Sequence, residues 1–252
     1  MDAIIITTGN EILKGRTVNT NFAFIGKLLT YSGYDVIKGI IIKDNLEDIK
    51  NAFIYAYNNA DLIVSSGGLG PTYDDMTLKG FSMAFNLKLI VNMDAFEMIK
   101  SKFKDSIITD EREKMAILPE GSIPVKNDAG TAPGVYKIIN GKKFIILPGV
   151  PKEVESIMNN ILNEIKIKDY FYYDDSIRAE NVMESKIAPL ISDMMKLYGD
   201  KVYIKTHPLG IENKNPGIEI EISSSGKDKN YVINNVKEIL NKIKDKINEN
   251  DY

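Results

Sequence analysis

The feature that most constrains the fold is the alternation of short β-branched runs with amphipathic helical segments in the first half of the chain. Residues 3–8 are a short β-branched run closed by Gly9, and residues 61–65 are a second run with an apolar centre that ends shortly before Gly67; both are typical of strands buried on both faces. Residues 21–29 between them carry apolar side chains at helical spacing, and Asn45 can cap a helix that runs to about residue 57. This alternation predicts a parallel, doubly wound α/β sheet.

A β-hairpin is expected later in the same region. The β runs 135–139 and 143–147 flank an Asn-Gly pair at residues 140–141, which is a strong signal for a tight hairpin turn. Pro151 then fits the first position of a helix that extends to about residue 165.

The order of predicted strands and helices changes near residue 168, and we predict a domain boundary there. The preceding stretch 86–120 is less regular, with helices expected over 94–103 and 110–117. From residue 169 the pattern indicates strand, helix, strand, strand and helix, over residues 170–178, 184–197, 201–206, 217–223 and 229–247. Residues 207–216, with two prolines, are expected to form a loop. We therefore predict an α/β domain over 1–168 and a small α+β (βαββα) domain over 169–252.

Composition excludes several classes of chemistry. The 252 residues include no Cys and one His, so there is no thiolate nucleophile, disulfide, Cys-based metal site or zinc site with two His ligands. A Ser-His-Asp triad would have to use His207, which we expect to be an ordinary loop residue. Any metal would be held by oxygen atoms, as Mg²⁺ is. Acid–base work would fall mostly to the 35 Asp and Glu, the 32 Lys and Arg or the 13 Tyr side chains.

Charge and hydropathy set further expectations about partners and location. The net charge of -3 gives no global basic field, so nucleic acid is not an expected partner. No apolar run approaches the ~20 residues of a membrane span, and the chain begins directly with a core strand, so we expect no membrane partner and no signal peptide. A cytoplasmic protein is the default expectation.

Four segments rich in glycine, proline and polar residues follow predicted strands. They are residues 7–16 with 19–21, residues 65–77, residues 127–134 and residues 147–153. Loops that leave the carboxyl ends of strands line the ligand crevice of an open α/β sheet. We therefore expect these four segments to share one pocket.

The segment 65–77 is the most informative of the four. Gly67, Gly68 and Gly70 allow backbone N–H groups to approach an anion, as phosphate sites require. The segment has neither the Gly-Lys-Ser/Thr ending of a Walker loop nor the third glycine of a dinucleotide motif. Asp74 and Asp75 would repel an anion unless a cation such as Mg²⁺ bridged carboxylate and phosphate.

Each candidate also has a purely structural interpretation. Asp74 and Asp75 could cap a helix, and Glu11 could be a solvated loop acid. Helix capping could equally explain Glu153, Asn19, Thr20 and Asn21; a surface position could explain Arg112 and Lys114; and turn geometry could explain Gly130 and Gly134.

Taken together, the four segments resemble the CinA family (competence/damage-inducible protein A), whose N-terminal domain belongs to the molybdopterin-binding MoaB/MogA-like superfamily. The most specific match is residues 67–77, with a Gly-Gly-x-Gly motif followed by Asp75-x-Thr77. Further blocks match in order at residues 9–13 with Gly15, 19–21, 130–134, 148–153 and, in the small domain, Arg178 with Glu184-Ser185.

The resemblance implies a three-layer α/β/α sandwich with a mostly parallel sheet and a nucleotide or pterin pocket. Family members of this type are associated with ADP-ribose pyrophosphatase activity, which needs a divalent metal such as Mg, Mn or Co. Relatives bind molybdopterin and handle its adenylylated form, and the superfamily forms dimers or trimers. By analogy, Asp75 is the acid at the reacting phosphate. Two features depart from the family: the chain has no room for the nicotinamide-mononucleotide deamidase domain, and the usual Lys-Gln-Ala reads Lys114-Met115-Ala116.

The leading hypothesis is a metal-dependent phosphoanhydride hydrolase acting on an ADP-ribose-like nucleotide. Asp75 and Asp74 are its expected catalytic and metal-binding residues, with Glu11 and Glu153 as second candidates for metal or base. The expected ligand-binding residues are Gly9, Glu11, Asn21, Gly67, Gly68, Gly70, Pro71, Thr72, Thr77, Lys114, Gly130, Ala132, Pro133, Gly134, Pro148, Gly149, Pro151 and Glu153.

Two other hypotheses stay open. The same pocket could bind molybdopterin or a nucleotide without turning it over, or take part in adenylyl transfer of the molybdenum-cofactor type. The small domain could serve assembly or single-stranded nucleic acid, although its acidic residues match or exceed its basic ones.

Overall fold

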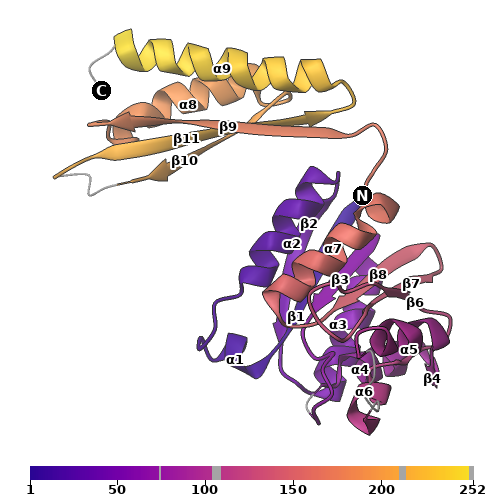
Figure 1. Ribbon diagram of the computed structural model, residues 1–252. Helices are drawn as coiled ribbons and strands as arrows, with labels where there is room; N and C mark the ends of the chain where they lie inside the picture. The colour runs from indigo at the N-terminus through magenta and orange to yellow at the C-terminus, as the bar shows by residue number, and fades with distance from the viewer. Residues whose placement is uncertain (74, 104–108, 210–213, 250–252) are drawn as a thin grey trace. The chain divides into compact units, whose positions relative to one another are not determined.

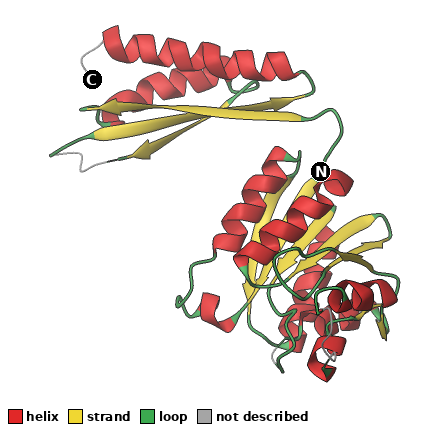
Figure 2. Ribbon diagram, in the orientation of Figure 1, coloured by secondary structure: helices red, strands yellow, loops and turns green. Residues whose placement is uncertain are grey.

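The computed structural model describes residues 1–73, 75–103, 109–209 and 214–249. The chain forms two compact units, Met1–Thr30 with Tyr34–Lys166 and Tyr31–Gly33 with Ile167–Tyr252 (Figure 1). Each unit has its own sheet and helices (Figure 2). Within the described ranges, no helix is long and apolar enough to cross a membrane.

The first unit is built on a six-stranded sheet in the order β2-β1-β3-β8-β7-β6. Its strands are β1 (Asp2–Thr8), β2 (Asp35–Ile42), β3 (Leu62–Ser66), β6 (Ile123–Val125), β7 (Gly134–Ile139) and β8 (Lys142–Leu147). Strand β1 pairs in parallel with β2 and β3, and β3 pairs in parallel with β8. Strands β7 and β6 continue the sheet in antiparallel fashion. The sheet is therefore mixed and mostly parallel, as predicted.

Helices cover both faces of this sheet. They are α1 (Asn10–Leu13), α2 (Thr20–Tyr31), α3 (Leu46–Asn59), α4 (Thr77–Phe85), α5 (Met93–Lys100), α6 (Asp110–Lys114) and α7 (Pro151–Ile165). Ile4 of β1 belongs to a core cluster with Phe53 of α3 and Phe81 of α4. A Cβ at Gly26 of α2 would lie 3.8 Å from Ile5, the next residue of β1. Because neighbouring strand residues face opposite sides, α2 lies across the sheet from α3 and α4, which confirms the three-layer sandwich (Figure 1).

The core explains the continuous apolar run at the N-terminus. Residues 3–6 have no exposed surface, because helices cover both faces of β1. Beside them, the ring of Phe81 lies 5.0 Å from that of Phe53 and 5.2 Å from that of Phe144, in edge-on or tilted arrangements that aromatic pairs favour.

The helix cap and the hairpin turn predicted from short sequence signals are both present in the structure. Asn45 caps α3 by accepting hydrogen bonds from the backbone N–H groups of Glu47 and Asp48. Strands β7 and β8 form the predicted hairpin, and both residues of its turn, Asn140 and Gly141, have positive φ angles of 49° and 83°. That geometry is the turn in which Asn-Gly is preferred.

Residues 86–120 differ from expectation. The helix expected over 94–103 is α5, which ends at Lys100, and the helix expected over 110–117 is α6, which ends at Lys114. After α6 the chain extends into β5 (Ile117–Pro119), which pairs with β4 (Leu89–Val91) in a separate two-stranded sheet. This pairing joins segments far apart in sequence, so local periodicity does not show it.

The second unit has the expected βαββα order. Its elements are β9 (Phe171–Glu180), α8 (Glu184–Tyr198), β10 (Tyr203–Pro208), β11 (Gly217–Gly226) and α9 (Lys229–Glu249). The antiparallel sheet runs β10-β11-β9, and the helices bury Ile218, Ile220 and Ile222 of β11. This confirms the small α+β fold.

His207 lies in strand β10 and not in the loop expected over 207–216. It pairs opposite Glu219 of β11, and its Nε2 is 3.2 Å from Glu221 Oε2. Pro208 ends the strand, and proline is tolerated at the end of an edge strand because its missing N–H is not needed there.

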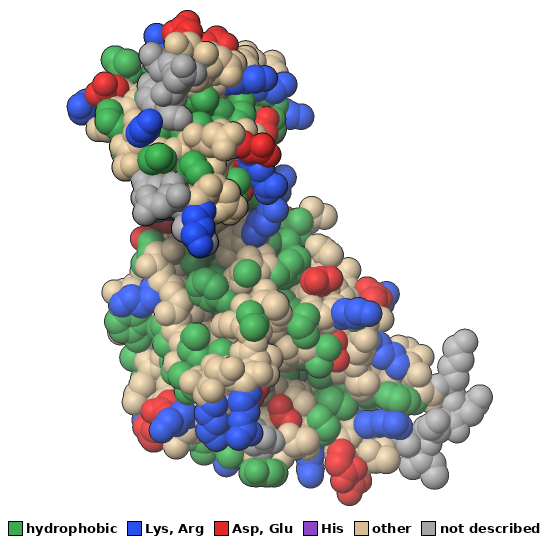
Figure 3. Space-filling view, turned by 90° about the vertical axis from the view of Figure 1, so that its left-hand side faces the viewer, with side chains coloured by type: hydrophobic (Ala, Val, Ile, Leu, Met, Phe, Trp, Pro, Cys, Tyr) green, Lys and Arg blue, Asp and Glu red, His purple; other side chains and the backbone are tan. Residues whose placement is uncertain are grey.

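Charged side chains do not form one large single-sign surface in the view of Figure 3. Lys and Arg side chains are scattered there among acidic and apolar ones. This distribution agrees with the small net charge of -3.

Candidate functional site

A cavity of about 690 Å³ opens in the first unit where strands β1, β3 and β8 end. Thr8 ends β1, Gly67 follows β3 and Pro148 follows β8, and all three line the cavity. Parallel strands bring their carboxyl ends to one edge of a sheet, so loops far apart in sequence meet there.

Most of the expected site residues come together in or beside this cavity. Twelve line it: Gly9, Glu11, Gly67, Gly68, Gly70, Pro71, Thr72, Asp75, Ala132, Pro148, Gly149 and Glu153. An adjoining hollow of about 200 Å³ adds Lys114 and Pro133, and another of about 90 Å³ adds Asn21 and Pro151. Thr77, Gly130 and Gly134 line none of these three spaces, and Asp74 lies outside the described residues.

The glycine loop after β3 adopts backbone conformations that few residues other than glycine reach. Gly67 and Gly68 have φ angles of 110° and 69°. A Cβ at Gly67 would collide with the backbone carbonyl of Thr8. The loop therefore needs glycine for close backbone approach as well as for its dihedral angles.

The amides of this loop are not all available to a ligand. The N–H of Gly67 donates to the carbonyl of Leu147 at 3.0 Å and so belongs to the sheet. The N–H groups of Gly68 and Gly70 donate to no other residue that the structure describes. The anion-binding nest expected from three glycines is thus reduced to the amides that follow Gly67.

Thr77 stabilises the glycine loop through hydrogen bonds to the loop's backbone. It is fully buried, its hydroxyl donates to the carbonyl of Gly67 at 2.7 Å, and its N–H donates to the carbonyl of Gly68 at 3.2 Å. Since its hydroxyl proton is used inside the protein, Thr77 shapes the loop and does not line the cavity as expected.

Asp75 is held by Thr72 on the cavity wall. The backbone N–H and the hydroxyl of Thr72 both donate to Asp75 Oδ2, at 2.8 and 2.5 Å. Helix α4 begins at Thr77 with Met76 as its cap residue, and no side-chain hydrogen bond caps it. Asp75 therefore does not serve as the helix cap that sequence alone allowed.

Glu153 projects from the first turn of α7 and is held by a buried amide. Asn127, which is 2% exposed, donates from Nδ2 to Glu153 Oε2 at 2.9 Å and to the carbonyl of Ala132 at 2.8 Å. Its Oδ1 accepts from the N–H groups of Ala129 and Gly130 at 3.1 and 2.9 Å. Asn127 thus ties the third loop to the cavity carboxylate.

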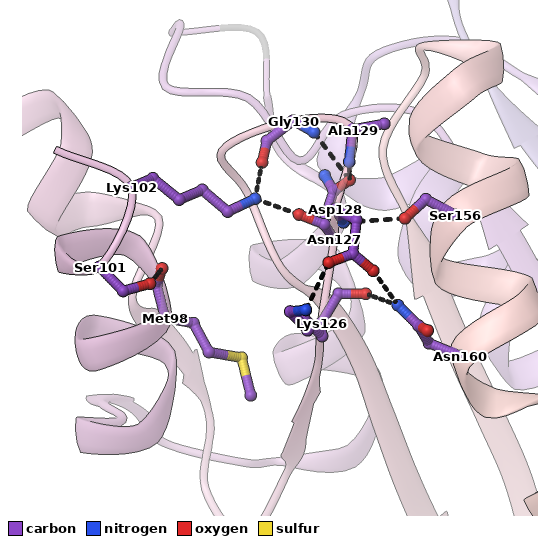
Figure 4. Close-up of polar contacts among 10 residues, drawn as sticks. All are labelled: Met98, Ser101, Lys102, Lys126, Asn127, Asp128, Ala129, Gly130, Ser156 and Asn160. Atoms are coloured by element: carbon purple, nitrogen blue, oxygen red, sulfur yellow. Dashed lines mark hydrogen bonds and ion pairs between the residues drawn. The ribbon is translucent and has the colours of Figure 1, made fainter.

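Two side chains brace this turn from opposite sides (Figure 4). Lys102 donates from Nζ to the carbonyls of Asn127 and Gly130, and its partial burial lowers its pKa. Asn160 of α7 donates to the carbonyl of Lys126 at 2.8 Å and to Asp128 Oδ2 at 2.9 Å. The turn is therefore fixed before any ligand binds.

Hydrogen bonds from Asn160 and Lys126 lower the pKa of Asp128. The N–H of Asp128 donates to Ser156 Oγ at 2.8 Å, also shown in Figure 4. Asp128 therefore stabilises the turn through its hydrogen bonds. The sequence indicated it only as one residue of the segment 127–134.

Gly130 and Gly134 allow close approach to α7. A Cβ at Gly130 would collide with the carboxyl group of Glu153, and one at Gly134 would collide with Ile157. Neither has positive φ, so these glycines act through size. Gly130 in particular leaves the space that Glu153 occupies.

Asn21 joins the loops that follow β3 and β8. Its Nδ2 donates to Ser66 Oγ and to the carbonyl of Gly149, both at 2.8 Å. Ser66 Oγ donates in turn to the carbonyl of Pro148 at 3.1 Å. Asn21, Ser66 and Gly149 line the hollow of about 90 Å³, so this network fixes part of its wall.

The cavity also contains residues that sequence reasoning missed. They are Asp44, Phe103, Thr109, Glu111 and Met115, together with Arg112, which was expected at the surface. Thr8, Thr131 and Val150 also line the cavity, and they belong to the segments predicted to share one pocket. Asp44 lies two residues after the end of β2, so the rule that loops after strands line the site could have found it. Arg112 and Phe103 come from the irregular stretch, where no local pattern indicates a site.

The described wall of the cavity is predominantly acidic. Its charged residues are the acids Glu11, Asp44, Asp75, Glu111 and Glu153 and the single base Arg112. Yet no group of three His, Cys, Asp or Glu side chains within the described ranges is close enough to hold a metal ion. The carboxylates are thus spread around the wall. His207 is not among the lining residues.

Comparison with known proteins places this arrangement in a family. Residues 4–167 match the sequence family described as "Probable molybdopterin binding domain". A protein of Caldivirga maquilingensis is 46% identical over 246 residues, which are 96% of this chain and 95% of that protein. Protein Ta0487 of Thermoplasma acidophilum is 51% identical over 227 residues, which are 90% of this chain and 88% of that protein.

One solved structure supports the same grouping. A crystal structure of "the protein CinA with unknown function" from Thermoplasma acidophilum is 51% identical, with a TM-score of 0.64, and covers 66% of this chain and 100% of the solved one. The resemblance expected from the glycine loop is thus confirmed, and the chain belongs to the family of probable molybdopterin-binding domains as a CinA-like member.

Proposed function

We propose that the protein binds the diphosphate of an ADP-ribose-like nucleotide together with a divalent cation and hydrolyses its phosphoanhydride bond. The observation that carries the proposal is the juxtaposition of the glycine loop with Asp75. The N–H groups of Gly68 and Gly70 donate to no other described residue, and Asp75 lines the same cavity. Backbone amides in such a loop are suited to phosphate oxygens.

The cavity has a suitable size. Its volume of about 690 Å³ lies inside the range of roughly 300–1,000 Å³ that is typical of small-molecule sites. Its walls combine backbone groups, carboxylates and the apolar side chains of Phe103 and Met115, as a ligand with both charged and apolar parts requires.

The charge of the wall supports a need for a cation. Five carboxylates and one guanidinium would repel a diphosphate, and a divalent ion bound with it removes that repulsion. Mg²⁺ commonly uses only one or two protein carboxylates, with substrate phosphates and water completing its oxygen ligands. The dispersed carboxylates fit such an ion, with Asp75 as the proposed ligand and Asp74 beside it in sequence. The ion would lower the charge on the phosphates and the pKa of a bound water.

The chain's own residues would divide the remaining work. The amides of Gly68 and Gly70 hold phosphate oxygens, and Glu153, fixed by Asn127, accepts the proton of the attacking water. Glu11 is the alternative base. Attack forms a bond from water oxygen to one phosphorus and breaks the bridging P–O bond. The products are AMP and ribose 5-phosphate, and this chemistry needs no Cys or His.

The direct test measures AMP released from ADP-ribose with Mg²⁺, Mn²⁺ or Co²⁺, and with a chelator. We expect release with at least one metal and none with the chelator. Absence of release with every metal would overturn the proposed hydrolysis.

A second candidate is a binding module for molybdopterin or a nucleotide, with adenylyl transfer of the molybdenum-cofactor type as its catalytic variant. The description of the matching family favours a pterin ligand. Calorimetric binding of a pterin or nucleotide without hydrolysis under any metal would support this candidate over the first.

A further inference from the structure

Arg112 occupies a distinctive place in the cavity. It is the one basic side chain among the described residues of a wall that carries five carboxylates. It comes from α6, whose short sequence gives no indication of a site. A cation retained on an otherwise acidic wall marks the place where an anionic group of a ligand would be best stabilised.

The guanidinium of Arg112 is oriented by Phe103. Its central carbon lies 3.7 Å from the centre of the Phe103 ring, and both residues line the cavity. Such a contact is the cation–π arrangement that arginine favours. It covers one face of the guanidinium and leaves the N–H groups at its edge able to donate.

Nothing in the described chain occupies those N–H groups. Arg112 makes no ion pair with a described carboxylate, although acids flank it in sequence. The pKa of its neighbour Glu111 is lowered by its own backbone N–H, the hydroxyl of Thr109 and the charge of Lys114, and not by Arg112. Among the described residues, the N–H donors of Arg112 thus have no partner, and Arg112 lines the cavity, where a ligand could accept from them.

We infer that Arg112, stacked on Phe103, is a phosphate clamp that determines specificity for phosphorylated ligands. A guanidinium presents two parallel N–H donors that match two oxygens of one phosphate, which an ammonium cannot do. Arg112 covers one face of the Phe103 ring, so a nucleobase cannot stack on that face. At this place the pair therefore recognises a phosphate. The inference rests on the proposed nucleotide ligand but does not depend on hydrolysis.

Calorimetry with AMP and adenosine tests the clamp in the full-length protein with Mg²⁺ present. AMP has no phosphoanhydride bond, so its binding is measured without turnover. We expect the unchanged protein to bind AMP more tightly than adenosine. Arg112→Met should weaken AMP binding by about tenfold or more, in line with a charge-assisted hydrogen-bonded pair, and leave adenosine binding within about twofold.

Three further variants sharpen the test. Arg112→Lys keeps the charge but loses the paired donors, so AMP binding should fall between those of the unchanged protein and Arg112→Met. Phe103→Leu should weaken AMP binding in the same direction by loosening the guanidinium. Arg178→Met is the matched control, because Arg178 pairs with Glu219 in the second unit, and it should change neither affinity.

The inference is overturned if Arg112→Met weakens AMP and adenosine equally, or if it weakens neither. Its failure is distinguishable from failure of the proposed function. An Arg112-dependent affinity for AMP without ADP-ribose hydrolysis would refute the hydrolase alone. Hydrolysis whose KM does not change in Arg112→Met would refute the clamp alone.

Discussion

Asn127 donates its side-chain amide to Glu153 Oε2 across 2.9 Å and is itself 2% exposed. The bond joins the loop after β6 to the first turn of α7. These two segments are distant in sequence and come together only when the chain folds. It converts Glu153 from a residue of a helix start into a carboxylate held at a fixed position on the cavity wall.

Replacing Asn127 should damage both stability and the site. Asn127→Asp keeps the shape and the acceptor for Ala129 and Gly130 but places a second carboxylate against Glu153. We expect a loss of about 1–3 kcal/mol in unfolding free energy and a fall in ADP-ribose turnover. Urea unfolding and AMP release measure the two effects.

Asn160→Ala is the control for that change. Asn160 braces the same turn through Lys126 and Asp128 but does not touch Glu153. It should lower stability and leave most turnover in place. Equal loss of turnover in both variants would show that Asn127 only supports the turn.

Gly67→Ala should be strongly destabilising. Gly67 has a φ of 110°, and an added Cβ would collide with the carbonyl of Thr8. We expect a loss of about 1–3 kcal/mol for the dihedral strain, with more for the collision. Gly149→Ala is the matched control, because the nearest atom to its new Cβ is 3.8 Å away. Similar melting temperatures for the two variants would contradict this reasoning.

Thr77→Val tests whether the hydroxyl supports the glycine loop. The change removes the donor to Gly67 and leaves a buried carbonyl without that partner, which should cost about 1–3 kcal/mol of unfolding free energy. Thr77→Ser keeps the hydroxyl and should lose less of this stability than valine does. Urea unfolding that ranks valine as the milder change would argue against the support role.

Asp128 should make the free energy of unfolding depend on pH in the acid range. Hydrogen bonds from Asn160 and Lys126 lower its pKa below the ordinary 3.8, so the folded state binds this proton less readily than the unfolded chain. Its contribution is present above pH 3.8 and is lost as the pH falls through the lowered pKa. Asp128→Asn should therefore unfold at lower urea concentration near about pH 7, with the difference shrinking near about pH 3.

The control for this pH effect removes Asn160, the first of the donors that lower the pKa of Asp128. In an Asn160→Ala protein, the change Asp128→Asn should cost less stability near about pH 7 than it does in the unchanged protein. A difference for Asp128→Asn that stays constant across the acid range would contradict the assignment.

The sequence predicted the sandwich because its strongest signals are local. The buried run at residues 3–6, the Asn45 cap and the Asn140-Gly141 turn each follow from short-range physics. The convergence of four loops followed from the general rule for parallel sheets. These features predict that Gly68, Asp75 and Glu153 line one site, and all three line the same cavity.

The features that the sequence did not predict depend on contacts between segments that are distant in the chain. The β4–β5 sheet and the placement of Arg112 on Phe103 arise in a stretch without clear periodicity. The use of the Gly67 N–H by Leu147 and of the Thr77 hydroxyl by Gly67 depends on hydrogen bonds that glycine spacing cannot show. The two prolines at residues 208 and 216 predict a loop that includes His207, whereas Pro208 in fact ends an edge strand that contains His207.

The most direct measurement of the central claim is AMP release from ADP-ribose by two matched variants in the presence of the best divalent metal. Asp75→Asn removes the charge of a cavity carboxylate, and Asp94→Asn makes the same change at an exposed position of α5. The account predicts that release falls by about 100-fold or more in Asp75→Asn and is unchanged in Asp94→Asn. Undiminished release in Asp75→Asn would contradict it.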